Sequence, residues 1–137
     1  SGGIYGLGRH PMIKFLEGNF EVTTKNNHYP NRINVEDLAK IILFSIQNHS
    51  PKRIINVTDQ KNVTTFDAID YVTKELGLTN PIPIDYEKAK ISDMAREFFL
   101  SSKTVRSKIL SEDFNYNYIY PDYKEALLYL TKLTMEV

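Results

Sequence analysis

Residues 31–46, with the sequence NRINVEDLAKIILFSI, place a short strand pattern directly before a helical pattern. Arg32 to Val35 is strand-like, and the two acidic residues that follow it suit the first turn of a helix. The apolar residues of the predicted helix are Leu38, Ile41, Ile42, Leu43, Phe44 and Ile46. They recur at helical spacing over a wide arc, so we expect this helix to be covered on more than one side.

A second strand and a second helix follow. Arg53 to Val57 is predicted to be a buried strand, and Thr64 with Asp67 resembles a capping box at the start of a helix that Gly77 ends. The order strand, helix, strand, helix defines a βαβα unit, in which the strands run parallel with a right-handed crossover. The sequence therefore predicts a small α/β domain, and residues 1–137 are short enough to form that single domain.

Shorter elements are expected around this unit. We predict a short helix over Pro11–Gly18, a strand over Phe20–Thr24 and an extended linker over Asn80–Pro83. A further helix is expected over Glu87–Phe99, and a last one after Pro121 and Asp122.

Composition excludes several classes of protein. The 17 basic and 17 acidic residues balance, so the chain has no general attraction for nucleic acid or anionic lipid. The absence of cysteine excludes disulfides, thiolate metal sites and a cysteine nucleophile. No apolar run is long enough to span a bilayer and no signal peptide opens the chain, so we expect a cytoplasmic protein that binds no membrane. The alternating aromatics of residues 114–118 fit a half-buried strand better than a base-stacking surface.

The opening glycines, Gly2 to Gly8, invite comparison with a phosphate-binding loop. Such a loop joins a strand to the N-terminus of a helix, but no strand precedes these glycines. Arg9 and Pro11 also stand where a third glycine is expected. We interpret the segment as a turn that leaves a short strand.

Other candidate motifs are weaker. The pairs Tyr86/Lys90 and Tyr120/Lys124 have the spacing that lets an ammonium lower the pKa of a phenol on one helix face. A chain so rich in tyrosine and lysine produces such pairs by chance, so we assign no catalytic residue. The three histidines, His10, His28 and His49, lack the spacing of a metal site, and no metal is expected.

Arg9 and Arg32 are better candidates for binding. A guanidinium group binds phosphate or carboxylate through two parallel hydrogen bonds. Arg9 follows the glycine turn and Arg32 begins a strand. Each side chain could contact a ligand or serve a structural ion pair.

Several segments, taken in order, resemble the C-terminal part of extended short-chain dehydrogenase/reductases of the NAD-dependent epimerase/dehydratase type. Residues 3–9 (GIYGLGR) resemble the family segment GIYGPGR, with Leu7 in place of proline. Residues 31–39 (NRINVEDLA) resemble NRIHVxDLA, with Asn34 in place of histidine. Residues 55–59 (INVTD) and the tail at residues 120–127 (YPDYKEAL) also match, so the likeness covers nearly the whole chain.

This resemblance implies that the chain is the substrate-side C-terminal lobe of a Rossmann-like fold. In the family, the cofactor loop and the catalytic Tyr-x-x-x-Lys lie upstream of the first matched segment, so we expect an N-terminal Rossmann domain to be missing here. By the same likeness, Tyr5, Gly6 and Arg9 approach the active-site cleft, and Arg32 and Asn34 line the substrate pocket.

The expected function follows from the resemblance. The parent protein would be an NAD(P)-dependent epimerase, dehydratase or reductase acting on a small molecule, with a nucleotide sugar as one candidate. The parent would bind NAD or NADP, and this chain alone would bind neither and would not be catalytic. The alternative is a stand-alone, non-catalytic α/β domain that binds a ligand or protein. Apolar surface left open by a missing domain would also favour self-association, such as a homodimer.

Overall fold

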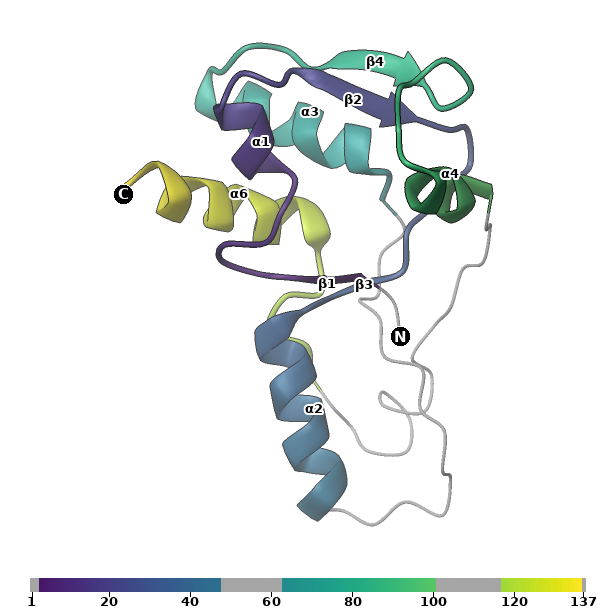
Figure 1. The fold of residues 1–137 in the computed structure, drawn as a ribbon. Helices are drawn as coiled ribbons and strands as arrows, with labels where there is room; N and C mark the ends of the chain where they lie inside the picture. Colours follow the sequence, from purple (N-terminus) through teal and green to yellow (C-terminus); the bar gives the residue numbers. More distant parts are fainter. Residues whose placement is uncertain (1–2, 48–62, 101–116, 137) are drawn as a thin grey trace.

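In the computed structural model, described over residues 3–47, 63–100 and 117–136, four strands form two small parallel sheets. β1 (Gly3–Tyr5) pairs with β3 (Arg32–Asn34), and β2 (Glu21–Thr24) pairs with β4 (Ile82–Asp85) (Figure 1). The parallel pairing confirms the predicted α/β class. The predicted strand over Arg53–Val57 lies outside the described residues, so the pairing between the two strands of the βαβα unit is not described.

The glycine-rich opening is a strand followed by a tight turn, as predicted. Gly6 and Arg9 exchange two backbone hydrogen bonds of 3.0 Å, and Gly8 has a φ of 82°. Glycine adopts this left-handed conformation without steric cost. α1 (Met12–Leu16) begins directly after Pro11, where the short helix was expected.

The predicted helix signals are confirmed at both ends of α3 (Thr65–Leu76). The Thr64 hydroxyl accepts a hydrogen bond of 3.0 Å from the Asp67 backbone N–H, and Gly77 ends the helix with a φ of 65°. α2 (Val35–Gln47) follows β3 without a connecting residue. Asp122 caps the start of α6 (Tyr123–Met135), because its side chain accepts from the Lys124 N–H.

The main core lies where α3 packs against α6. α1 also contacts α6, and β2 contacts α3, so these three helices lie between the β2–β4 sheet and the β1–β3 sheet (Figure 1). The buried apolar side chains of this core are Tyr5, Met12, Phe15, Val22, Val63, Ala68, Ile69, Val72, Tyr123, Ala126, Leu127 and Leu130. A smaller cluster, Ile33 with Ile41, joins β3 to α2.

The prediction of an extended linker over residues 80–83 is wrong in part, because Ile82 begins β4. The backbone N–H groups of Ile82 and Tyr86 donate to the carbonyls of Phe20 and Thr24 at 2.8 and 2.9 Å. In a parallel pair only alternate residues donate to one neighbour. Pro83 occupies an intervening position, where its missing N–H costs no hydrogen bond with β2.

The helix predicted over Glu87–Phe99 is shorter at its start, because α4 spans Asp93–Leu100. The Asp85 carboxylate accepts from the Glu87 N–H at 2.9 Å, which favours a turn over a helix at this point. Ser92 then caps α4 by accepting from the Ala95 N–H at 3.1 Å. No residue of α4 is buried, so its apolar stripe does not face the core.

Candidate functional site

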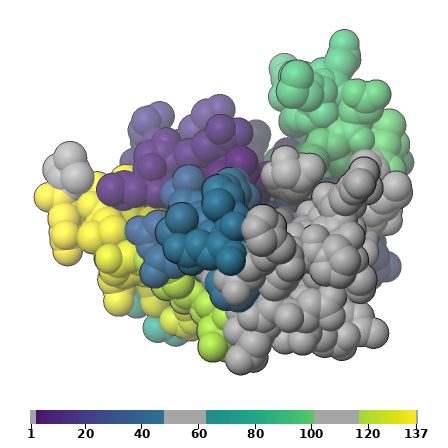
Figure 2. Space-filling model, turned by 90° about the horizontal axis from the view of Figure 1, so that it is seen from below, coloured from purple at the N-terminus to yellow at the C-terminus, as the bar shows by residue number. Residues whose placement is uncertain are grey.

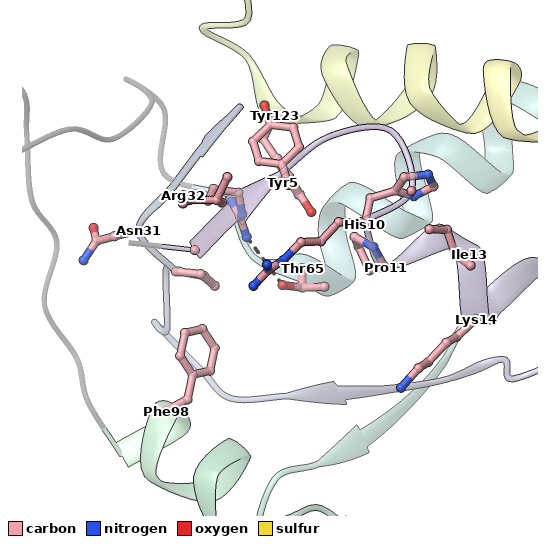
Figure 3. A pocket seen from close by; sticks show the side chains of 15 residues that line it. Tyr5, His10, Pro11, Ile13, Lys14, Asn31, Arg32, Thr65, Phe98 and Tyr123 are labelled. Atoms are coloured by element: carbon pink, nitrogen blue, oxygen red, sulfur yellow. Dashed lines mark hydrogen bonds between the residues drawn. The ribbon is translucent and has the colours of Figure 1, made fainter. Parts of the chain in front are cut away.

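A cavity of about 560 Å³ opens beside the tight turn that follows β1. It lies among β1, α1, β3 and the first residues of α3 and α6, with Phe98 of α4 at its edge (Figure 3). This volume is within the range of small-molecule sites in proteins. Tyr5, Arg9 and Arg32, three of the five predicted site residues, line this cavity.

The charge of the cavity lining is positive. Among the described residues that line it, Arg9, Lys14 and Arg32 are cationic and none is aspartate or glutamate. The surface of the cavity is mostly apolar, and cations gathered at a concave surface of this kind raise the local concentration of anions. The cavity is therefore suited to an anionic small molecule.

Arg32 is buried and is held by its own chain. Its Nη1 donates to the Val63 carbonyl at 2.9 Å, and its Nη2 lies 3.4 Å from the Thr65 hydroxyl. The guanidinium carbon stands 3.7 Å from the centre of the Tyr123 ring, a cation–π contact. The Tyr123 ring in turn packs edge-on against Tyr5, with ring centres 4.9 Å apart. Arg32 thus ties β3 to the starts of α3 and α6 and brings a fixed positive charge to the cavity.

Arg9 and Lys14 are exposed, in contrast to Arg32. Neither side chain makes a hydrogen bond or ion pair with the described part of the chain. The backbone turn between Gly6 and Arg9 fixes where the Arg9 side chain begins, and α1 does the same for Lys14. These two cations are the ones available to an incoming anion.

His10 also lines the cavity but adds no positive charge. Its Nε2 lies 2.9 Å from the Thr134 hydroxyl, which itself donates to the Leu130 carbonyl at 2.7 Å. The hydroxyl proton is committed to that carbonyl, so His10 Nε2 carries its own proton and donates. Burial lowers the pKa of His10 from 6.5, because the charged imidazolium loses hydration, and the ring is neutral at neutral pH.

Gly6 and Asn34 do not line the cavity. The Asn34 side chain is buried and accepts from the Glu36 N–H at 2.9 Å, so it caps the start of α2. Gly6 is packed closely, since a Cβ atom there would lie 2.7 Å from Cγ1 of Val35. Both residues have structural roles here, and their predicted contact with substrate stays a prediction.

Neither Tyr-x-x-x-Lys pair has the geometry of a proton-transfer site. Tyr86 and Lys90 lie in the connection before α4, and Tyr120 precedes α6, so neither pair shares a helix face. Burial raises the pKa of Tyr86, with Glu87 adding to the effect, and burial raises the pKa of Tyr120, with Glu36 adding to it. Catalysis would require a lower pKa in each case.

Asp37 is a residue whose importance the sequence did not reveal. Its carboxylate is fully buried and accepts two backbone hydrogen bonds, 2.8 Å from the Ile119 N–H and 2.9 Å from the Tyr120 N–H. This contact holds α2 against the segment that leads into α6. The sequence indicated only a favourable charge in the first turn of α2, and its partners lie more than 80 residues away.

Other kinds of site have no support in the described residues. They contain no group of three histidine, cysteine, aspartate or glutamate residues that could hold a metal ion. No helix within the described ranges combines the length and apolar character needed to cross a membrane.

Comparison with solved structures finds close likeness over nearly the whole chain. A functionally unknown conserved protein from Silicibacter pomeroyi is 32% identical, with a TM-score of 0.83, over 97% of this chain and 46% of that protein. The human epimerase family protein SDR39U1, solved with NADPH, is 18% identical with a TM-score of 0.76, over 96% of this chain and 46% of that one. UDP-N-acetylglucosamine 4-epimerase from Bacillus cereus is 16% identical with a TM-score of 0.68, over 98% of this chain and 46% of that protein.

These likenesses define the fold. The chain has the Rossmann-like α/β fold of about half of an epimerase-type structure, and it spans about half the length of each protein that it matches. No known protein-family profile matches the sequence, and no curated protein matches it.

Proposed function

We propose that this chain is the substrate-binding portion of an NAD(P)-dependent epimerase, dehydratase or reductase, and that the cavity beside Arg9 binds the anionic part of the substrate. The observation that carries the proposal is the cavity lining, with three cations and no carboxylate among its described residues. The fold likeness to two epimerase proteins supports the same conclusion.

Recognition begins at the exposed cations. The Arg9 guanidinium binds a phosphate through two parallel hydrogen bonds, and the Lys14 ammonium adds a second positive charge from α1. Arg32 adds charge without moving, because Val63 and Thr65 hold it in place. A nucleotide sugar, with its charged diphosphate, is a substrate that such a cavity would attract.

Hydride transfer belongs to the other portion of the parent protein, the counterpart of the part of each solved neighbour that this chain does not match. The human neighbour was solved with NADPH, and by analogy the parent protein uses NAD or NADP. Neither tyrosine–lysine pair of this chain lines the cavity, and the pKa values of Tyr86 and Tyr120 are raised. We therefore assign substrate contacts to this chain and proton transfer to the rest of the parent protein.

The test is a calorimetric titration of this chain with UDP-N-acetylglucosamine at low ionic strength. Loss of one charge-assisted contact in Arg9→Gln is expected to weaken binding by about tenfold. Lys132→Gln removes the same charge from the exposed side of α6, away from the cavity, and is the matched control. Binding that is absent, or that Arg9→Gln leaves unchanged, would contradict the proposal.

A stand-alone ligand-binding domain is the alternative, since the same cavity could serve it. The mass of the native protein separates the two functions. Upstream peptides with a glycine-rich strand–loop–helix support the enzyme, whereas a native chain of this length supports the binding domain.

A further inference from the structure

His10 is a buried residue of the cavity lining, and the fold uses only one of its two ring nitrogens. The side chain is 8% exposed, and its Nε2 donates to the Thr134 hydroxyl near the end of α6. Figures 1 and 2 both show the N-terminal segment around α1 lying beside α6. The other ring nitrogen, Nδ1, is buried and has no hydrogen-bond partner among the described residues.

An unpartnered Nδ1 requires an explanation, because most buried polar atoms in proteins have a hydrogen-bond partner. The ring proton is on Nε2, since the Thr134 hydroxyl gives its own proton to the Leu130 carbonyl. Nδ1 is therefore an acceptor that lost its contact with water on folding. α6 closes the Nε2 edge of the ring, so the Nδ1 edge is the one left for a molecule in the cavity.

The charges around His10 favour an anion as its partner. The titratable and charged side chains that line the cavity with His10 are Tyr5, Arg9, Lys14, Arg32 and Tyr123. The charged members of this set are all cations, so the described lining offers no carboxylate that would hold a proton on His10. Other charged residues at the ends of α1 and α6, exposed and outside the cavity lining, are Glu17, Lys132 and Glu136. An incoming anion would supply the missing negative charge.

We infer that Nδ1 of His10 takes up a proton when an anion binds in the cavity, and that the new N–H donates to this anion. The inference rests on the part of the proposed function in which the cavity binds an anion. A neutral Nδ1 would turn its lone pair toward the lone pairs of a phosphate oxygen, which is repulsive. Protonation converts the acceptor into a donor and gives the anion a further positive partner. The proton comes from solvent, only the N–H bond forms, and Nε2 keeps its hydrogen bond to Thr134.

This proton uptake makes anion binding depend on pH. Burial lowers the pKa of His10 in the free chain, so the ring is neutral at neutral pH. A bound anion raises the pKa of the same group, because it stabilises the charged imidazolium. By linkage, the affinity for the anion must then increase as the pH falls. Contacts from arginine and lysine alone give no such dependence below about pH 8.

Calorimetric titration with UDP-N-acetylglucosamine at about pH 5.5 and pH 8 tests this inference, because neither its diphosphate nor its base titrates between these values. The affinity should be about tenfold higher at the lower pH. Titrations at about pH 6 in buffers of different ionisation enthalpy should report net proton uptake. His10→Gln, whose amide can still donate to Thr134, should abolish the proton uptake and flatten the pH dependence. His28→Gln changes a buried histidine that does not line the cavity, and it should retain both effects.

Nuclear magnetic resonance of the His10 imidazole in the unsubstituted chain is a second measurement, which needs no variant that folds. Sulfate is the probe, because it does not titrate near neutral pH, and chloride at equal ionic strength is the control. The pKa of His10 should be higher in sulfate than in chloride. A purely structural role of His10 would give the same pKa in both salts.

The outcomes separate this inference from the proposed function. Binding of UDP-N-acetylglucosamine with equal affinity at both pH values and without proton uptake would overturn the inference and leave the proposed function intact. Proton uptake that persists in His10→Gln would overturn it as well, because another group would then take up the proton. If the nucleotide sugar does not bind but sulfate raises the pKa of His10, the proposed function fails and the inference stands. Equal pKa values in the two salts, without binding of the nucleotide sugar, would overturn both.

Discussion

Asp37→Asn should destabilise the fold strongly, although it changes one heavy atom of a side chain that does not line the cavity. The buried carboxylate accepts from the Ile119 and Tyr120 N–H groups at 2.8 and 2.9 Å. An amide keeps one acceptor oxygen and turns its NH₂ group toward the other backbone N–H. A hydrogen bond to a charged group contributes about 1.5–3 kcal/mol, and an unsatisfied buried donor adds a further cost. We expect a loss of about 2–4 kcal/mol, against a total stability of about 5–15 kcal/mol for a domain of this kind.

Urea unfolding followed by circular dichroism measures this loss. With an m-value of about 2 kcal/mol/M, the midpoint should fall by about 1–2 M. Asp93→Asn is the matched control, because Asp93 is also in the first turn of a helix but is exposed. Its effect should stay within about 0.5 kcal/mol. Equal midpoints for the two variants would refute the view that Asp37 clamps α2 to the start of α6.

Two further predictions concern residues near the cavity. The Tm of the chain should fall between about pH 7 and pH 5, because burial lowers the pKa of His10 below 6.5 and the unfolded chain takes up this proton first. His10→Gln should reduce that pH dependence in a series of calorimetric scans. If Tm changes with pH as steeply in the variant as in the original chain, other groups cause the pH dependence. Gly6→Ala should cost about 1–3 kcal/mol in urea unfolding, because the new Cβ would lie 2.7 Å from Cγ1 of Val35. Combining it with Val35→Ala should recover part of the loss, and no recovery would place the strain elsewhere.

The local elements of this protein could be predicted from its sequence. Thr64 and Gly77 mark the two ends of α3, and apolar spacing located the middle of α2. Such signals act within one helical turn, so they need no knowledge of the rest of the fold. The predictions were wrong where a distant partner decided the local structure. Ile82, for example, begins a strand because its N–H donates to the carbonyl of Phe20, the residue just before β2.

The candidate site needed the tertiary structure. The sequence selected Arg9 and Arg32 for their chemistry, but only the fold shows that Arg32 is held by Val63 and Tyr123 while Arg9 faces solvent. It also shows that Lys14 lines the same cavity and that Asn34 caps α2. A side chain's neighbours are set by how helices and strands pack across long separations in the chain, and that packing leaves no local pattern. The sequence by itself determined which segments become helices and which residues have the chemistry to bind an anion. The packing of those segments decided which of these residues line the same cavity.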